Sequence, residues 1–171
     1  EIKETGTTFR ENALIKARVT AAATGQMALA DDSGLEVDYL RGAPGVFSSR
    51  YAGPGKNDKA NNNKLLEALK GVPSCQRGAR FRCVIALVTP QGREFLSEGV
   101  CEGRITTQPC GTKGFGYDPL FLIPSLEKTF AELGSHVKNR ISHRSMAVRA
   151  MRDVLARLLE EGMEEGCGSV F

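Results

Sequence analysis

The sequence has few cysteines and histidines, and neither occurs in a metal-binding pattern. Its 171 residues include five cysteines and two histidines, and no two cysteines have C-x-x-C spacing. This spacing excludes the usual zinc sites and gives no disulfide framework. Unpaired thiols in odd number fit a reducing compartment, so we expect a cytoplasmic protein.

Long hydrophobic runs and strong net charge are missing as well. No apolar stretch approaches the ~18 residues of a membrane-spanning helix, and no signal peptide is expected. The G-x-S-x-G, Walker A and H-E-x-x-H motifs do not occur. The formal net charge is only +3, which gives little support for a nucleic-acid partner. The composition leaves an anionic small molecule as an open possibility.

What the sequence contains is an alternation of helical and strand patterns. Thr8 and Glu11 form a T-x-x-E capping box, which predicts a helix over residues 7–25. Apolar spacing predicts further helices over 59–69 and from Ser142 to a stop at Gly162. Strands are expected over 27–31, 34–40, 80–88, 94–104 and 115–124. This order, with one long β-hairpin, predicts an α/β fold with a mixed sheet in a single domain.

The segment ALADDSGLEVDYLRGAPGVFSSRYAG (residues 28–53) carries more polar chemistry than a turn needs. Asp31, Asp32 and Ser33 follow a short apolar run. Because neighbouring strand residues point to opposite faces, only one aspartate can face a cleft, and Asp32 is the better candidate. The alternative is an Asx or Ser turn that binds its own backbone.

A second segment, KGFGYDPLF (residues 113–121), places glycines around an aromatic residue. Gly114 and Gly116 let a ligand approach the backbone, and Phe115 can stack on a planar base. The alternative is a strand entry with a bulge, whose aromatic residues fill the core.

Basic residues gather where the last helix is expected to begin. They are Lys138, Arg140, His143 and Arg144. A helix N-terminus disfavours cations, so this placement indicates a bound anion such as a polyphosphate. The alternative is a solvated basic face. Near the other end of the chain, Glu4 and Lys16 are either an exposed pair or a carboxylate for Mg²⁺ beside a cation.

These segments together resemble the inosine triphosphate pyrophosphatase family, also called Ham1-like. The matching runs, in family order over nearly the whole chain, are ETGTTFRENALIKA, residues 28–53, GFGYDPLFLIP and SHRSMAVRAM. The resemblance implies hydrolysis of non-standard purine nucleoside triphosphates (dITP, ITP and XTP) to the monophosphate and pyrophosphate. It also implies Mg²⁺ as cofactor, two lobes around a central cleft and a homodimer.

The resemblance also implies roles for individual residues. Asp32 matches the general base, and Glu4 and Asp32 match the metal ligands. The implied substrate contacts are Ser33, Lys16, Phe115, Gly116, Tyr117, Asp118, Lys138, His143 and Arg144. We expect the acidic group around Asp32 and the cationic group around Arg144 to share one groove. The family pattern opens with a strand and a T-G-N-x-x-K phosphate loop, which residues 1–171 are expected to lack.

Two alternatives stay open. One is a Maf-like nucleotide pyrophosphatase with a different base preference. The other is an inactive nucleotide-binding or dimerisation module that lacks the phosphate loop.

Overall fold

The computed structural model describes residues 2–167, and five strands of this part form one sheet. The strands lie in chain order: β1 (Ala28–Val37), β2 (Gly78–Val88), β3 (Glu94–Ile105), β4 (Phe121–Ile123) and β5 (Lys128–Thr129). The α-helices are α1 (Phe9–Thr24), α2 (Asp58–Ala68), α3 (Ser135–Ile141) and α4 (His143–Cys167). Short 3-10 helices span Asp38–Leu40, Gly45–Arg50, Ser74–Gln76 and Pro124–Leu126. The predicted α/β fold is confirmed.

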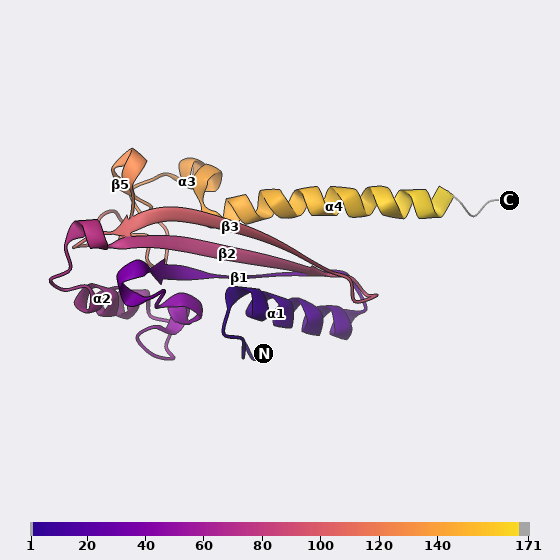
Figure 1. Cartoon of the computed structure of the whole chain (residues 1–171), viewed down its shortest axis with the longest axis horizontal. Helices are drawn as coiled ribbons and strands as arrows, with labels where there is room; N and C mark the ends of the chain where they lie inside the picture. The colour runs from indigo at the N-terminus through magenta and orange to yellow at the C-terminus, as the bar shows by residue number, and fades with distance from the viewer. Residues whose placement is uncertain (1, 168–171) are drawn as a thin grey trace.

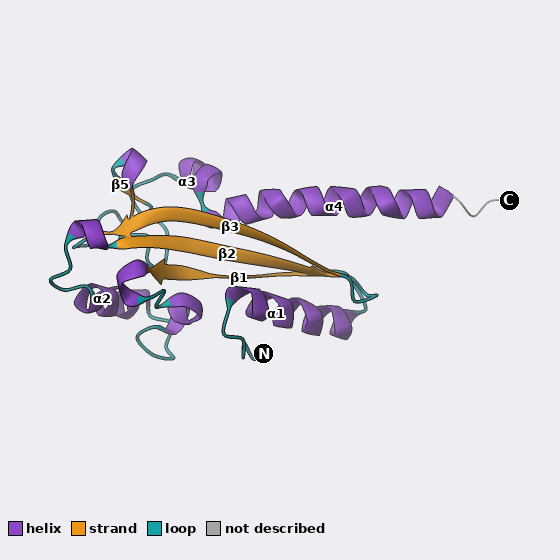
Figure 2. Ribbon diagram, in the orientation of Figure 1, coloured by secondary structure: helices purple, strands orange, loops and turns teal. Residues whose placement is uncertain are grey.

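The pairing within the sheet differs in one respect from the expected mixed sheet. All the ladders between the described strands are antiparallel. The long hairpin of β2 and β3 is present as predicted, with Val88 paired to Glu94 next to its turn. Antiparallel neighbours need only short connections, and this hairpin places two long strands side by side at the centre of the sheet (Figure 2).

Strand β1 is continuous where the sequence predicted two strands with a turn between them. It pairs with β2 through the whole acidic segment, with Asp32 opposite Val84 and Ser33 opposite Cys83. The alternative of an Asx or Ser turn is therefore wrong. The strand is possible because side chains of neighbouring helices bind the polar groups, as described below. At Gly34, a Cβ would lie 2.4 Å from Ser48 Oγ, so glycine lets the Gly45–Arg50 helix lie against β1.

Helices α1 and α4 cover opposite faces of the sheet (Figure 1). The predicted capping box at the start of α1 is confirmed: Glu11 N donates to Thr8 Oγ1 and Thr8 N donates to Glu11 Oε2. The apolar side of α1 packs on one face of the sheet, and Ala147 and Met151 of α4 pack on the other. At Gly99 of β3, a Cβ would lie 2.1 Å from the His143 carbonyl oxygen. Glycine therefore allows the first turn of α4 to contact the sheet.

The last helix differs from its prediction at both ends. It begins at His143 and continues through Gly162 to Cys167. Ser142 has extended backbone angles (φ −71°, ψ 152°), which separate α4 from the short helix α3. Lys138 and Arg140 therefore belong to α3, and the basic residues do not all lie at the start of one helix.

A third core fills the other end of the sheet. It joins Leu65 of α2 with Phe81, Phe121 and Phe130, and the Phe81 and Phe121 ring centroids are 4.5 Å apart. The elements α2, α3 and β5 gather at this end, and α1 and α4 flank the opposite end (Figure 1). Separate cores at the two ends agree with the predicted two-lobed arrangement. The polar residues of β1 lie between them.

Candidate active site

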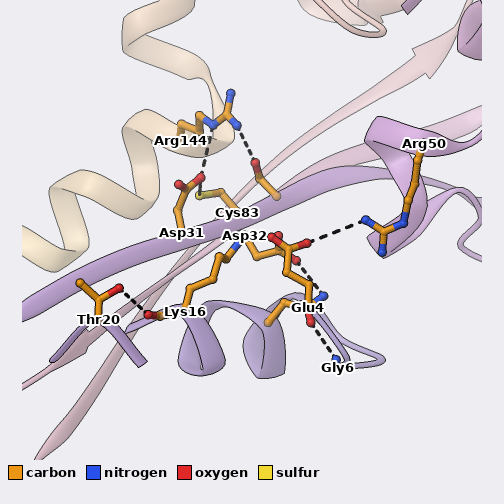
Figure 3. Close-up of polar contacts among 11 residues, drawn as sticks. Glu4, Gly6, Lys16, Thr20, Asp31, Asp32, Arg50, Cys83 and Arg144 are labelled. Carbon is orange, nitrogen blue, oxygen red and sulfur yellow. Dashed lines mark hydrogen bonds and ion pairs between the residues drawn. The ribbon is translucent and has the colours of Figure 1, made fainter. Parts of the chain in front are cut away.

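The acidic segment of β1 presents its side chains to both faces of the sheet. Asp32 contacts Lys16 of α1, whereas Asp31 and Ser33 contact Arg144 of α4. The prediction that only one of the two aspartates faces a given side is confirmed. The same alternation separates the two groups that we expected to share a groove: the cluster around Asp32 and the Arg144 guanidinium lie on opposite faces of β1 (Figure 3). The two groups thus flank one strand at the edge of the described sheet, and a groove shared by them stays a prediction.

Glu4, Lys16 and Asp32 form a compact charged cluster on the α1 face. Lys16 Nζ lies 2.9 Å from Asp32 Oδ1 and 3.0 Å from Glu4 Oε1. Only 20% of the Lys16 side chain and 13% of the Asp32 side chain are exposed. The alternative of an ordinary exposed Glu4–Lys16 pair does not describe this arrangement. The segment before α1 brings Glu4 to a carboxylate that lies 28 residues further along the chain.

The protonation equilibria of this cluster follow from its burial. Burial raises the pKa of the Asp32 carboxyl, and this effect outweighs the opposing hydrogen bond and positive charge of Lys16. Burial also acts to lower the pKa of Lys16, but the hydrogen bonds to Asp32 and Glu4 outweigh it and raise this pKa above its ordinary value. A carboxylate with a raised pKa is a stronger base, which suits proton abstraction near neutral pH.

The two carboxylates of the cluster are also ligands of the kind that a divalent cation takes. The carboxylate oxygens of Glu4 and Asp32 converge on one positive centre, the Lys16 ammonium. Mg²⁺ commonly takes one or two carboxylates and completes its shell with water and phosphate oxygens. Within residues 2–167, no group of three or more His, Cys, Asp or Glu side chains is placed to hold a metal ion. A cation held by Glu4 and Asp32 would therefore complete its shell with water, and with phosphate oxygens when a nucleotide is bound.

Arg144 occupies the opposite face of β1, at the start of α4. Its Nη2 donates to Ser33 Oγ at 2.9 Å, and its Nε lies 3.6 Å from Asp31 Oδ2. Its Cζ also lies 5.3 Å from the centroid of the Phe115 ring. Arg144 thus connects the acidic strand with the glycine-rich segment. Both were candidate substrate-binding segments in the sequence.

Phe115 is the exposed aromatic residue of that segment. Its exposed fraction is 61%, and the Lys138 ammonium lies 4.8 Å from its ring centroid. Lys138 also forms an ion pair with the buried Asp118, whose Oδ2 accepts a hydrogen bond from Phe115 N. A ring held by cations and open to solvent can stack on a planar base.

The segment itself is a turn, and β4 begins only at Phe121, not at 115 as predicted. Gly114 and Gly116 have φ of 81° and 60°, and a Cβ on Gly114 would lie 2.0 Å from Asp118 Oδ2. Helix α2 holds the turn from outside, because Asp58 Oδ2 accepts from Gly116 N and Asn62 Nδ2 donates to Gly116 O. Glycine is thus required here for the close packing of the backbone.

Tyr117 and His143 are more deeply buried than a ligand contact would suggest. Tyr117 is 3% exposed, and its hydroxyl donates to the Ser48 carbonyl oxygen at 2.9 Å. His143 stacks on Phe81 with ring centroids 4.8 Å apart. Burial, with help from the charges of Arg144 and Lys138, lowers the pKa of His143 to about 3. His143 is therefore neutral at pH 7 and does not belong to the cationic group. The substrate contacts assigned to both residues stay predictions.

Several neighbours of the site were not among the candidates from the sequence. They are Asn12, Arg50, Asp58 and Asn62. Arg50 Nη1 lies 3.9 Å from Glu4 Oε2, and Asn12 contacts Asp32. Asn12 offered a signal, since it lies four residues before Lys16 and therefore on the same side of a helix. The others reach the site through contacts between distant segments.

Comparisons with known proteins identify a family and agree with the fold. The sequence profile described as Ham1 family matches residues 1–154. A dITP/XTP pyrophosphatase of Desulforamulus reducens is 56% identical over 158 residues, covering 92% of this chain and 79% of that protein. One of Bacillus licheniformis is 54% identical and covers 91% and 79%. The structure of the Staphylococcus aureus Ham1 protein matches with TM-score 0.88 and 43% identity over 91% of this chain and 80% of that one.

The fold, together with the family match over most of the chain, defines an α/β protein of the Ham1 type. The chain belongs to the Ham1 family. Among the residues that the structure describes, none of the helices combines the length and apolar character needed to cross a membrane.

Proposed function

We propose that this chain hydrolyses non-standard purine nucleoside triphosphates (dITP, ITP and XTP) to the monophosphate and pyrophosphate. The observation that carries the proposal is that the carboxylates of Glu4 and Asp32 lie close together and both contact the Lys16 ammonium. The relatives named dITP/XTP pyrophosphatase, at 54–56% identity, support the choice of substrate. The Maf-like reading is less well supported, because the family match covers residues 1–154.

In the proposed reaction, Asp32 acts as the general base. A water molecule attacks the α-phosphorus, and Asp32 takes the proton that this water loses. The new bond joins the water oxygen to the α-phosphorus, and the bond from that phosphorus to the β-phosphate oxygen breaks to release pyrophosphate. Bound Mg²⁺ would offset negative charge on the phosphate oxygens, and Glu4 and Asp32 would hold it.

Lys16 supplies positive charge that stays in place throughout the reaction. Its raised pKa keeps the ammonium protonated at neutral pH. Electrostatic stabilisation of the phosphoryl group is the main contribution that proteins make to this kind of transfer. Lys16 therefore has two roles in the proposal: it orients Asp32 through the 2.9 Å contact, and it attracts phosphate oxygens.

Recognition of the base is assigned to the other face of β1. The exposed ring of Phe115 would stack on the purine, and Lys138 and Asp118 would hold that ring in place. Arg144 carries N–H donors that suit the 6-oxo group of hypoxanthine and xanthine. Adenine presents an amino group at this position and would leave the donor unpaired. Because the two groups lie on opposite faces, the nucleotide would have to extend past β1 to reach both.

We propose Mg²⁺ as the metal, because it favours carboxylate and phosphate oxygens. We place the protein in the cytoplasm as a homodimer, with residues 1–171 in one domain. The unpaired cysteines support the compartment, and the family resemblance supports the dimer. Light scattering with size-exclusion chromatography would test the dimer, and a monomer at micromolar concentration would contradict it.

The test of the proposal is a substrate panel. Pyrophosphate release by the purified chain would be measured with Mg²⁺ and dITP, ITP, XTP, dATP, dGTP, dTTP or UTP. We expect the first three to be preferred over dATP by up to about 10⁴ in kcat/KM, because adenine would leave the Arg144 donor unpaired. Preference for dTTP or UTP would favour a Maf-like activity. No release above background would favour the inactive binding module.

A further inference from the structure

Asn12 is a fully buried asparagine in the first turn of α1, with 0% of its surface exposed. A buried amide is costly unless both of its ends form hydrogen bonds. Both ends are used here. Its Oδ1 accepts from Gly6 N at 2.8 Å, and its Nδ2 donates to Asp32 Oδ2 at 3.4 Å. One side chain thus connects the segment that carries Glu4 with the strand that carries Asp32.

The contact at Gly6 determines where Glu4 lies. Gly6 is two residues after Glu4, in the segment without helix or strand that precedes α1. A Cβ at this position would lie 2.7 Å from Asn12 Oδ1 and 2.6 Å from Glu11 Cβ. Only glycine therefore lets this segment approach α1 closely enough for the 2.8 Å bond.

The contact at Asp32 determines how its carboxylate is turned. Asn12 donates to Oδ2, and Lys16 donates to Oδ1 at 2.9 Å. The two donors lie four residues apart on α1 and bind the two oxygens separately. Since a carboxylate can only accept and a peptide N–H can only donate, the amide has one orientation that satisfies both partners.

We propose that Asn12 is a positioning residue that sets the separation and orientation of Glu4 and Asp32 for a divalent cation. It is assigned no contact with metal or nucleotide. The role of the cation rests on the function proposed above. Residues that orient metal ligands through hydrogen bonds typically contribute 10–100-fold to metal affinity or activity.

The test is a Mn²⁺ titration without nucleotide, in which electron paramagnetic resonance measures the concentration of the free ion. Asn12→Leu keeps a similar volume and removes both hydrogen bonds. We expect it to weaken Mn²⁺ binding by about 10–100-fold. Gly6→Ala keeps Asn12 but displaces the Glu4 segment, and it should weaken binding in the same direction.

Asn61→Leu is the matched control. Asn61 is also a buried asparagine, 2% exposed, with Oδ1 accepting from Ala52 N and Nδ2 donating to Ser49 O. We expect a comparable loss of thermal stability with unchanged Mn²⁺ affinity. Wild-type affinity in folded Asn12→Leu, or an equal loss in Asn61→Leu, would overturn the proposal. So would the absence of Mn²⁺ binding by the wild-type chain. If Mn²⁺ binds and depends on Asn12 but no nucleotide is cleaved, the proposed function fails and this inference stands.

Discussion

Asp31 and Asp32 are adjacent in sequence and have partners on opposite faces of β1. Asp32 Oδ1 lies 2.9 Å from Lys16 Nζ, and Asp31 Oδ2 lies 3.6 Å from Arg144 Nε. The side chain of Asp32 is 13% exposed and that of Asp31 is 46% exposed. Two identical carboxylates therefore occupy different electrostatic environments, which provides a matched pair of variants.

Asp32→Asn should lower kcat for dITP by a factor on the order of 10² or more, because it removes the general base. Asp31→Asn removes one exposed ion pair and should change kcat/KM by no more than about fivefold. Steady-state pyrophosphate release from both variants would measure this. Equal losses in the two variants would show that the base is not Asp32 alone.

Removal of Lys16 should shift the pH dependence of the reaction. Lys16 opposes the effect of burial, so Lys16→Met should raise the pKa of Asp32 further. Asp32 would then be deprotonated only at higher pH, and the acidic limb of the plot of kcat/KM against pH should shift to higher pH. Lys16→Arg keeps the charge and should shift the limb less. An unmoved limb in Lys16→Met would contradict the assignment of Asp32.

Phe115→Ala should weaken nucleotide binding through loss of stacking, which is worth about 1–3 kcal/mol per base. We expect KM for ITP to rise with a smaller change in kcat, and Phe115→Trp to retain most of the affinity. Tyr39→Ala is the control, because Tyr39 is an aromatic residue of similar exposure (53%) in the short helix Asp38–Leu40. A similar rise of KM in Tyr39→Ala would argue against a specific stacking role.

The buried His143 should make the fold sensitive to acid. Its pKa is lowered from 6.5 to about 3, so between these values the unfolded chain binds a proton that the folded chain does not. Stability should therefore fall as pH decreases from about 6.5 towards 3, by up to about 1.4 kcal/mol per pH unit from this group. Melting temperatures of wild type and His143→Phe across this range would test it. The variant should lose less stability, and parallel curves would refute the prediction.

Local sequence signals predicted the elements whose stabilising contacts are local. The Thr8–Glu11 box predicted the start of α1, because both of its hydrogen bonds lie within four residues. The β2–β3 hairpin followed from two strand-like segments joined by the turn residues TPQGR (residues 89–93). Local sequence patterns gave the wrong secondary structure where contacts between distant segments decide it. The Asp31–Gly34 run resembles a turn, but pairing with β2 and the partners Lys16 and Arg144 keep it extended.

At the candidate site, too, some features were predictable from the sequence and others depend on distant contacts. The residue types at the site followed from the family resemblance, whereas their arrangement on two faces of β1 required the structure. The break at Ser142 coincides with the predicted start of the last helix, and Ser145 N donates to Ser142 Oγ at 3.3 Å as in a helix cap. The sequence did not predict the separate short helix α3, which carries Lys138. The neutral state of His143 also depends on burial against Phe81, which is 62 positions away in the chain.

Gly99 has a consequence for how the protein tolerates mutation. A single methyl group there would meet the backbone of α4 at 2.1 Å, where no side chain can rotate away. The helix would have to lift, and Arg144 would move away from Ser33 with it. An inherited change at this position, which faces α4 and not the cluster of Glu4 and Asp32, would thus impair the proposed recognition of the base while the proposed proton acceptor stayed intact.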